Sequence, residues 1–193
     1  NVTFILKSST GGKVPTLTSS MYYDVYDNNQ WNFAVKISPS RYPWTAYVPT
    51  APIADYDIEF QGVNVDAGVV VNSFNVTGTA TAPGAAFMTG SRRAFVGAHR
   101  TNMTGTILQY CDAKIGSCRL WLDKLSQETI KAHSLDPTNY GLADTGLYAF
   151  PFQATASYGD LPRINTLMLN WDFNQNTGSD AAGSFRVADL SSG

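Results

Sequence analysis

Residues 107–140 read Ile-Leu-Gln-Tyr-Cys-Asp-Ala-Lys-Ile-Gly-Ser-Cys-Arg-Leu-Trp-Leu-Asp-Lys-Leu-Ser-Gln-Glu-Thr-Ile-Lys-Ala-His-Ser-Leu-Asp-Pro-Thr-Asn-Tyr. A strand is predicted from the apolar spacing of Ile115, Cys118, Leu120 and Leu122. It runs directly into a short connector at 123–125, and a helix follows. A strand coupled to one short helix, late in a strand-rich chain, is typical of a module that packs and binds.

The helix is predicted to begin at Ser126 and to end near His133. Serine is a favourable N-cap residue, because its hydroxyl accepts a hydrogen bond from an otherwise unpaired backbone N–H. Glu128 lies in the first turn, where a negative charge suits the helix dipole. Asp136-Pro137 then prevents the helix from continuing.

The rest of the chain reads as short strands separated by turns. Residues 31–37 alternate strictly, which places Trp31, Phe33, Val35 and Ile37 on one half-buried face. Residues 55–63 alternate in the same way. Residues 69–71 and 74–76 predict a further pair of strands. Many short strands with turns between them favour an all-β sandwich or jelly roll.

A boundary between modules is predicted near residue 160. Residues 142–165 are mostly small or polar, and 166–173 then predict a fresh strand. We therefore expect residues 1–160 to form one module, and 161–193 to hold a linker and the opening strands of a following module or an inter-subunit connector. The chain begins at Asn1 and not at Met, which suggests a processed protein or a piece of a longer one.

The composition and charge of the chain argue against several classes of function. Of the 193 residues, 44% are hydrophobic and 15% are charged, and the net charge is -2. Soluble proteins average about 25% charged residues, and a low share is common in extracellular and virion proteins. The sequence has no basic stripe, which argues against nucleic acid as a partner. It also lacks an apolar run near the roughly 18 residues that a membrane helix needs.

Residues 114–121, followed by 125–130, resemble the closing motif of laminin-G-like domains of the concanavalin A-like superfamily. That motif runs Gly-x-Ile-Asp-Glu-Val-Arg-Ile-Tyr and then Leu-Ser-x-x-Glu-Ile. The residues that match it are Ile115, Arg119, Leu125, Ser126 and Ile130. Residues 94–98 resemble the buried strand that precedes it, and 57–64 resemble modules of this type in large phage and virus structural proteins. Where the family has an acidic pair, this chain has Gly116-Ser117, so a calcium role for that pair does not carry over.

The resemblance covers roughly residues 20–140, and it implies a concanavalin A-like jelly-roll sandwich of two antiparallel sheets with one short helix. Such modules mostly bind glycans or proteins, and they often occur in tandem. We therefore expect a non-enzymatic binding and assembly module of a large virion or cell-surface protein, which locates it on a virion surface or outside cells. A purely structural filament or capsid subunit, assembling by strand exchange through 166–193, is an alternative.

An enzymatic alternative rests on Asp55, Asp57 and Glu59. Alternate strand positions share one face of a sheet. Some concanavalin-like glycosidases carry Glu-x-Asp-x-Glu in this arrangement, so the resemblance implies a nucleophile, a helper and an acid/base. Such positions lie about 6.5–7 Å apart along a strand, which permits the roughly 5–5.5 Å of a retaining glycosidase. Few cations neighbour the three carboxylates in the sequence, and a solvated polar face is the simpler interpretation.

Two groups of residues are candidates for ligand binding. Trp44 and Tyr47 lie in a Pro-flanked loop, where exposed rings could stack on a sugar or contact a protein. Arg92, Arg93 and Arg100 flank residues 94–98 and could hold an acidic sugar or a neighbouring carboxylate. Ordinary loop charges are the alternative for these arginines.

Calcium is the cofactor for which the sequence offers a candidate site. Asp24, Asp27 and Asn28 form an oxygen-rich stretch of the kind that suits calcium, although the same residues favour turns. Cys111 and Cys118 could bridge a hairpin, but free thiols with Cys118 in the core are the favoured interpretation.

Overall fold

The computed structural model describes residues 1–8, 14–26, 29–40, 56–80, 95–100, 105–136, 166–173, 178, 181 and 187–191. These residues form β-strands in antiparallel sheets and one short helix, which confirms the all-β class. None of the helical residues described forms a segment long and apolar enough to cross a membrane. The chain divides into two compact units, Asn1–Gly90 with Lys124–Pro162, and Ser91–Asp123 with Arg163–Gly193.

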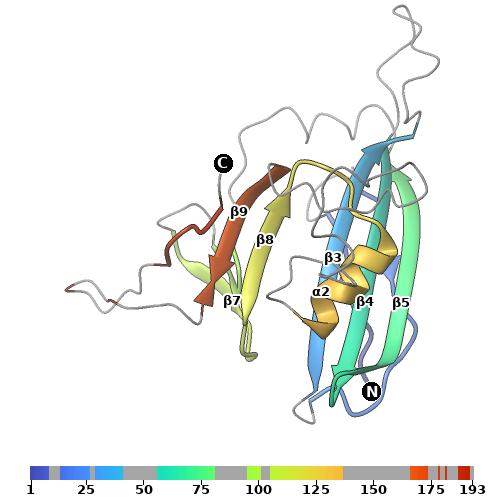
Figure 1. Cartoon of the computed structure of the whole chain (residues 1–193), viewed down its shortest axis with the longest axis horizontal. Helices are drawn as coiled ribbons and strands as arrows, with labels where there is room; N and C mark the ends of the chain where they lie inside the picture. Colours follow the sequence, from blue (N-terminus) through green and yellow to red (C-terminus); the bar gives the residue numbers. More distant parts are fainter. Residues whose placement is uncertain are drawn as a thin grey trace, which may run out of the picture. The chain divides into compact units, whose positions relative to one another are not determined.

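The first unit is built on an antiparallel sheet in the order β3 (Gln30–Pro39), β4 (Tyr56–Asp66) and β5 (Val69–Ala80), drawn in Figure 1. A two-residue turn joins β4 to β5, with φ of 49° at Ala67 and 77° at Gly68. Positive φ at both central residues matches the right-handed twist of a hairpin. The prediction of two short strands between 69 and 76 was wrong, because β5 is one strand paired with β4 along its length.

One face of this sheet is apolar and carries the core of the unit. Ile58 and Phe60 of β4 pack with Phe74 of β5 on this face. The N-terminal segment covers them with β1 (Ile5–Leu6) and β2 (Leu17–Thr18), which pair antiparallel. Further aromatic side chains pack against this core, namely Phe4, Tyr22, Trp31 and Tyr56.

Phe74 lies directly over Gly62, which faces the same core from the neighbouring strand. A Cβ atom at residue 62 would come within 2.2 Å of Cε1 of Phe74. The Phe74 ring has little room to move, because its centroid is 5.1 Å from that of Phe60 and 5.9 Å from that of Phe4. The close approach therefore requires glycine at residue 62.

The opposite face of the sheet carries helix α2 (Gln127–Leu135), which lies across the strands in Figure 1. The Ser126 hydroxyl accepts a hydrogen bond from the Thr129 N–H at 3.1 Å, which confirms the predicted N-cap. The helix runs two residues beyond the predicted end and is closed by Asp136. Asn32 of β3 holds it in place by donating from Nδ2 to Oγ of Ser134 at 2.9 Å.

The second unit contains two pairs of antiparallel strands. One pair joins β6 (Ala98–Arg100) to β7 (Ile107–Tyr110), and the other joins β8 (Ser117–Trp121) to β9 (Leu167–Asp172). The prediction of a buried strand over 94–98 was wrong for its described part. Phe95 and Val96 are exposed and precede the strand, and Gly97 has a positive φ of 79°.

Strand β9 pairs with β8 of the same chain. Cys118 lies opposite Trp171, and Leu120 lies opposite Leu169. The pairing places Arg163–Gly193 in one compact unit with Ser91–Asp123. One boundary between the two units lies between Pro162 and Arg163. Residues 91–123, which belong to the expected first module, group with residues 163–193, because a strand pairing between distant segments leaves no periodic signal in the sequence.

Candidate functional site

Strand alternation gathers polar side chains on the α2-bearing face of the first unit. In the sheet register, Lys36 of β3, Glu59 of β4 and Thr77 of β5 form one row across the three strands. The next row contains Asp57 and Thr79, with Ser38 opposite Asp57 on β3. Residues in the same row point to the same face, so these side chains share one surface.

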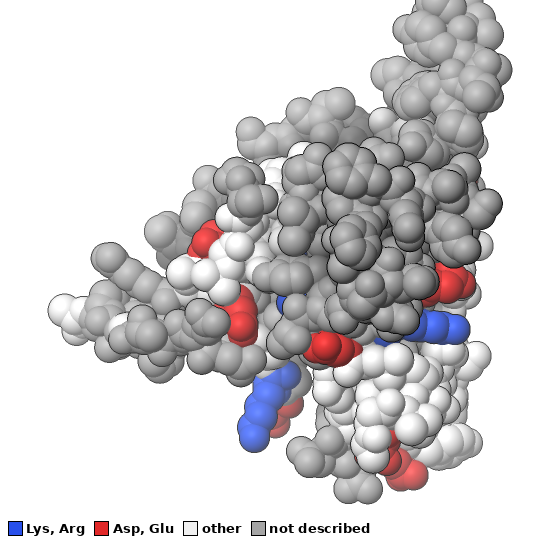
Figure 2. Space-filling view, in the orientation of Figure 1, with Lys and Arg blue, Asp and Glu red and all other residues white. Residues whose placement is uncertain are grey.

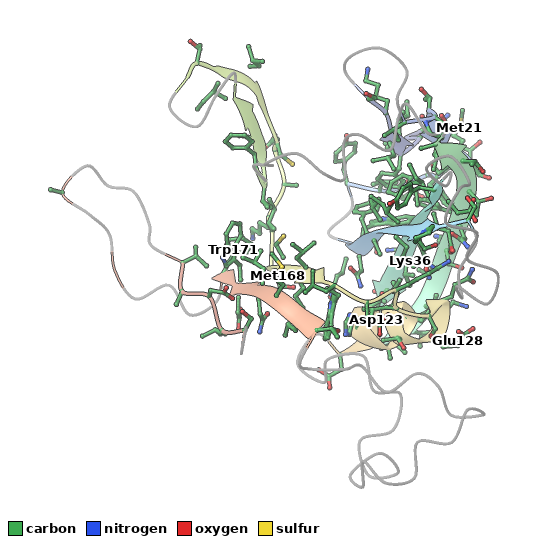
Figure 3. The ribbon with its side chains drawn as sticks, turned by 90° about the horizontal axis from the view of Figure 1, so that it is seen from above. Met21, Lys36, Asp123, Glu128, Met168 and Trp171 are labelled. Carbon is green, nitrogen blue, oxygen red and sulfur yellow. The ribbon has the colours of Figure 1, made fainter. Side chains whose placement is uncertain are left out.

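Glu59 lies at the centre of this surface between two lysines. Its Oε2 is 2.6 Å from Nζ of Lys36, and its Oε1 is 2.5 Å from Nζ of Lys124. The Lys36 side chain, labelled in Figure 3, is 6% exposed and the Glu59 side chain 15% exposed, so this ion pair is largely withdrawn from water. Lys124 comes from the connector just before α2, and it also donates to Oγ of Ser38 at 3.4 Å.

The two lysines determine the protonation state of Glu59. Burial alone would raise the pKa of its carboxyl group, because it penalises the charged form. Hydrogen bonds from Lys124 and Lys36, together with the attraction of their charges, outweigh burial and lower the pKa to about 2. Glu59 is therefore a fixed carboxylate over the whole physiological pH range.

Asp57 is held differently from Glu59. Its Oδ1 accepts a hydrogen bond from Oγ of Ser40 at 2.9 Å and another from Oγ1 of Thr79 at 3.2 Å. Hydroxyl groups, and not ammonium groups, therefore orient this carboxylate. Asp57 is half-buried near the start of β4.

An open hollow of about 320 Å³ lies over this end of the sheet. It is lined by Asp57, Glu59, Thr77, Gly78 and Thr79, and we call it the β4–β5 hollow. The polar side chains among these residues end in carboxylate or hydroxyl oxygens. Glycine at residue 78 is required by the opposite face, where a Cβ atom would come within 2.8 Å of side-chain atoms of Pro15 and Leu17.

The structure brings together two of the three carboxylates that the sequence singled out. Asp57 and Glu59 share one face of β4, and Asp55 lies outside the described residues. Few cations neighbour these carboxylates in the sequence, but the fold brings Lys36 and Lys124 into contact with Glu59. Both lysines are distant from Glu59 in the sequence. The alternation of residues 31–37 predicts that Lys36 lies on the polar face of its strand, but it does not show that Glu59 is its partner.

Trp44, Tyr47, Arg92 and Arg93 lie outside the described residues, and only the backbone of Arg100 is described, in β6.

The predicted calcium stretch is described only in part, because Asp27 and Asn28 lie outside the described residues. Asp24 is exposed with a φ of 58°, and its carbonyl accepts a hydrogen bond from Nδ2 of Asn29 at 3.0 Å. This is the geometry of a turn. In the described part of the chain, no group of three or more His, Cys, Asp or Glu side chains could hold a metal ion.

The two cysteines are free thiols, as the sequence favoured. Cys111 is exposed, whereas Cys118 is half-buried on β8. Burial raises the pKa of the Cys118 thiol, which keeps it protonated and unreactive.

Charged side chains are sparse over the described surface. On the face drawn in Figure 2, the described acidic and basic side chains are scattered, without a patch of one sign. The chain matches no family model, no curated protein and no solved structure.

Proposed function

We propose that this chain is a non-enzymatic binding and assembly module of a larger virion or cell-surface structural protein, with the β4–β5 hollow as a glycan site. We further propose that it has the laminin-G-like jelly-roll fold. The match of the closing motif supports the fold, together with the all-β class and the helix capped by Ser126.

The observation that carries the binding function is the state of Glu59. A glycosidase needs one carboxylic acid that is protonated at the working pH, so that it can protonate the leaving oxygen. Lys36 and Lys124 hold the pKa of Glu59 at about 2, which is far below the range of such an acid. A carboxylate that two lysines keep charged is unsuited to this proton transfer, and it leaves the neighbouring Asp57 and Thr79 as groups that can bind a ligand.

The lining of the hollow supports a glycan in particular. Sugar hydroxyls can donate hydrogen bonds to the Asp57 carboxylate and to the hydroxyl oxygen of Thr79, and they can exchange hydrogen bonds with the Thr77 hydroxyl. The hollow is open to solvent, so one residue of a longer chain could enter while the chain continues outside. Trp44 and Tyr47 remain candidates for stacking against such a chain.

A glycan array probed with the purified chain tests this proposal. We expect selective signals that the double variant Asp57→Asn/Thr79→Val removes. Asp66→Asn is the matched control, because Asp66 is an exposed carboxylate at the far end of β4. An array without any signal would overturn the proposal and favour a purely structural subunit. Release of reducing sugar from bound glycans would instead support the glycosidase alternative.

A further inference from the structure

We infer that the β4–β5 hollow selects an uncharged sugar that presents neighbouring hydroxyl donors, with Asp57 as the residue that contacts it. The inference rests on the proposed function and specifies the chemical class of ligand. It follows from the direction of the hydrogen bonds and from the balance of charge around the hollow.

Hydrogen-bond direction leaves Asp57 and its two hydroxyl partners rich in acceptors, and Asp57 and Thr79 of this group line the hollow. A carboxylate only accepts, so the hydroxyl hydrogens of Ser40 and Thr79 must both point at Oδ1 of Asp57. The oxygen atoms of these two hydroxyls are therefore left as hydrogen-bond acceptors. Oδ2 of Asp57 adds a further acceptor. A ligand that satisfies these atoms must bring donors of its own.

The oxygens of Glu59 are already committed. Each is in contact with one lysine ammonium, which leaves little capacity for a ligand. Glu59 therefore acts as a positioning residue. It holds Lys36 and Lys124 in ion pairs at the edge of the lining and takes part in the charge balance, whereas Asp57 contacts the ligand.

Charge balance decides between the possible donors. Among the four charged side chains described here, the negative charges of Asp57 and Glu59 are balanced by the positive charges of Lys36 and Lys124. An ammonium ligand would gain from Asp57 but be opposed by the lysines. The carboxylate of a uronate or sialate is a hydrogen-bond acceptor, and it cannot bond the acceptor oxygens of Asp57 and Thr79. Neighbouring hydroxyls of an uncharged sugar supply donors without a charge, and two of them can bond one carboxylate.

Calorimetric titration with three matched sets of oligosaccharides tests the inference. The sets are neutral hexose oligomers, uronate oligomers of the same length, and oligomers that bear free amines. We expect a neutral set to bind, with an affinity that changes by less than about twofold between low and high salt, because no net charge is screened. The Asp57→Asn variant should weaken binding by at least about tenfold, because a hydrogen bond to a charged group is lost.

The outcomes separate the inference from the proposed function. A failure of every set to bind would remove the proposed function itself. Tighter binding of the uronate or amine set would overturn the inference and leave the binding function intact, and so would neutral binding that Asp57→Asn does not weaken. Asp66→Asn should leave every affinity unchanged. Thermal unfolding of each variant verifies that a lost affinity does not reflect a lost fold.

Discussion

On one face of strand β4, Ile58 and Phe60 pack against a cluster of aromatic rings, and on the other face Glu59 lies between two lysines. The apolar face is stabilised by burial, which is non-directional and roughly proportional to the area removed from water. The polar face depends on particular partners, because a buried charge without its partner is costly. A single strand thus carries the core on one side and the candidate site on the other, because successive side chains of a strand point to opposite faces.

Removing Phe74 should weaken the apolar face most. Phe74→Ala leaves a cavity among the rings of Phe4, Trp31 and Phe60, and large-to-small changes of buried Phe cost about 3–5 kcal/mol of unfolding free energy. Urea denaturation followed by circular dichroism measures the loss. Val69→Ala, at an exposed position of the same strand, is the control. A loss below about 1 kcal/mol for Phe74→Ala would contradict a core centred on this ring.

Removing Glu59 should weaken the polar face by about 3 kcal/mol, because Glu59→Gln leaves the buried Lys36 without its carboxylate. The same denaturation experiment measures it, with the exposed Glu128 changed to Gln as the matched control. The double variant Glu59→Leu/Lys36→Met should recover much of the loss, since apolar residues of similar volume often replace a buried ion pair at little cost. If Glu59→Gln proves as mild as its control, the pair is solvated and the contrast between the faces fails.

Low pH should weaken the polar face and leave the packing of the apolar face unchanged, so it tests the contrast without a core mutation. The pKa of Glu59 is lowered from 4.5 to about 2 in the folded chain, so its stabilising contribution is complete above about pH 4.5. That contribution is lost as the pH falls from 4.5 through 2, where the folded state also becomes protonated. Wild type should therefore lose stability more steeply than Glu59→Gln over this window. Parallel pH curves from the two proteins would show that Glu59 is not ion-paired in solution.

Loss of the helix cap should have the smallest effect. Ser126→Ala removes the acceptor for the Thr129 N–H and should cost about 1 kcal/mol. Ser73→Ala, at an exposed position of β5, is the control and should change stability by less than about 0.5 kcal/mol. Ser126→Asp should restore the cap, because aspartate is an equally good N-cap residue. An Ala variant as stable as wild type would mean that packing against the sheet, and not the cap, fixes where α2 begins.

The features that could be predicted from the sequence are local ones. Ser126 and the residues after it determine the helix start by hydrogen bonds within one turn, and the structure confirms that start. The alternation of residues 55–63 placed Asp57 and Glu59 on one face, and this is also confirmed. In both cases neighbouring residues in the chain carry the whole signal.

The remaining features depend on partners distant in sequence. The burial of β3 is nearly the reverse of what its alternation suggests, since Phe33 and Val35 are 44% and 48% exposed, whereas Lys36 and Ser38 are each 8% exposed. Glu59 and Lys124 cover those two polar residues. No pattern within residues 31–37 shows that a lysine from the helix connector reaches the same carboxylate, and none shows that β9 pairs with β8.

The contact between Gly62 and Phe74 also limits how this chain can change over time. A side chain at residue 62 would meet the Phe74 ring at 2.2 Å, so almost any substitution there is harmful while the ring remains. Once a substitution has placed a small side chain at residue 74, a larger side chain at residue 62 can fill the space that the ring occupied. The order of the two changes is therefore fixed, and lineages that took the first step would be the ones able to take the second.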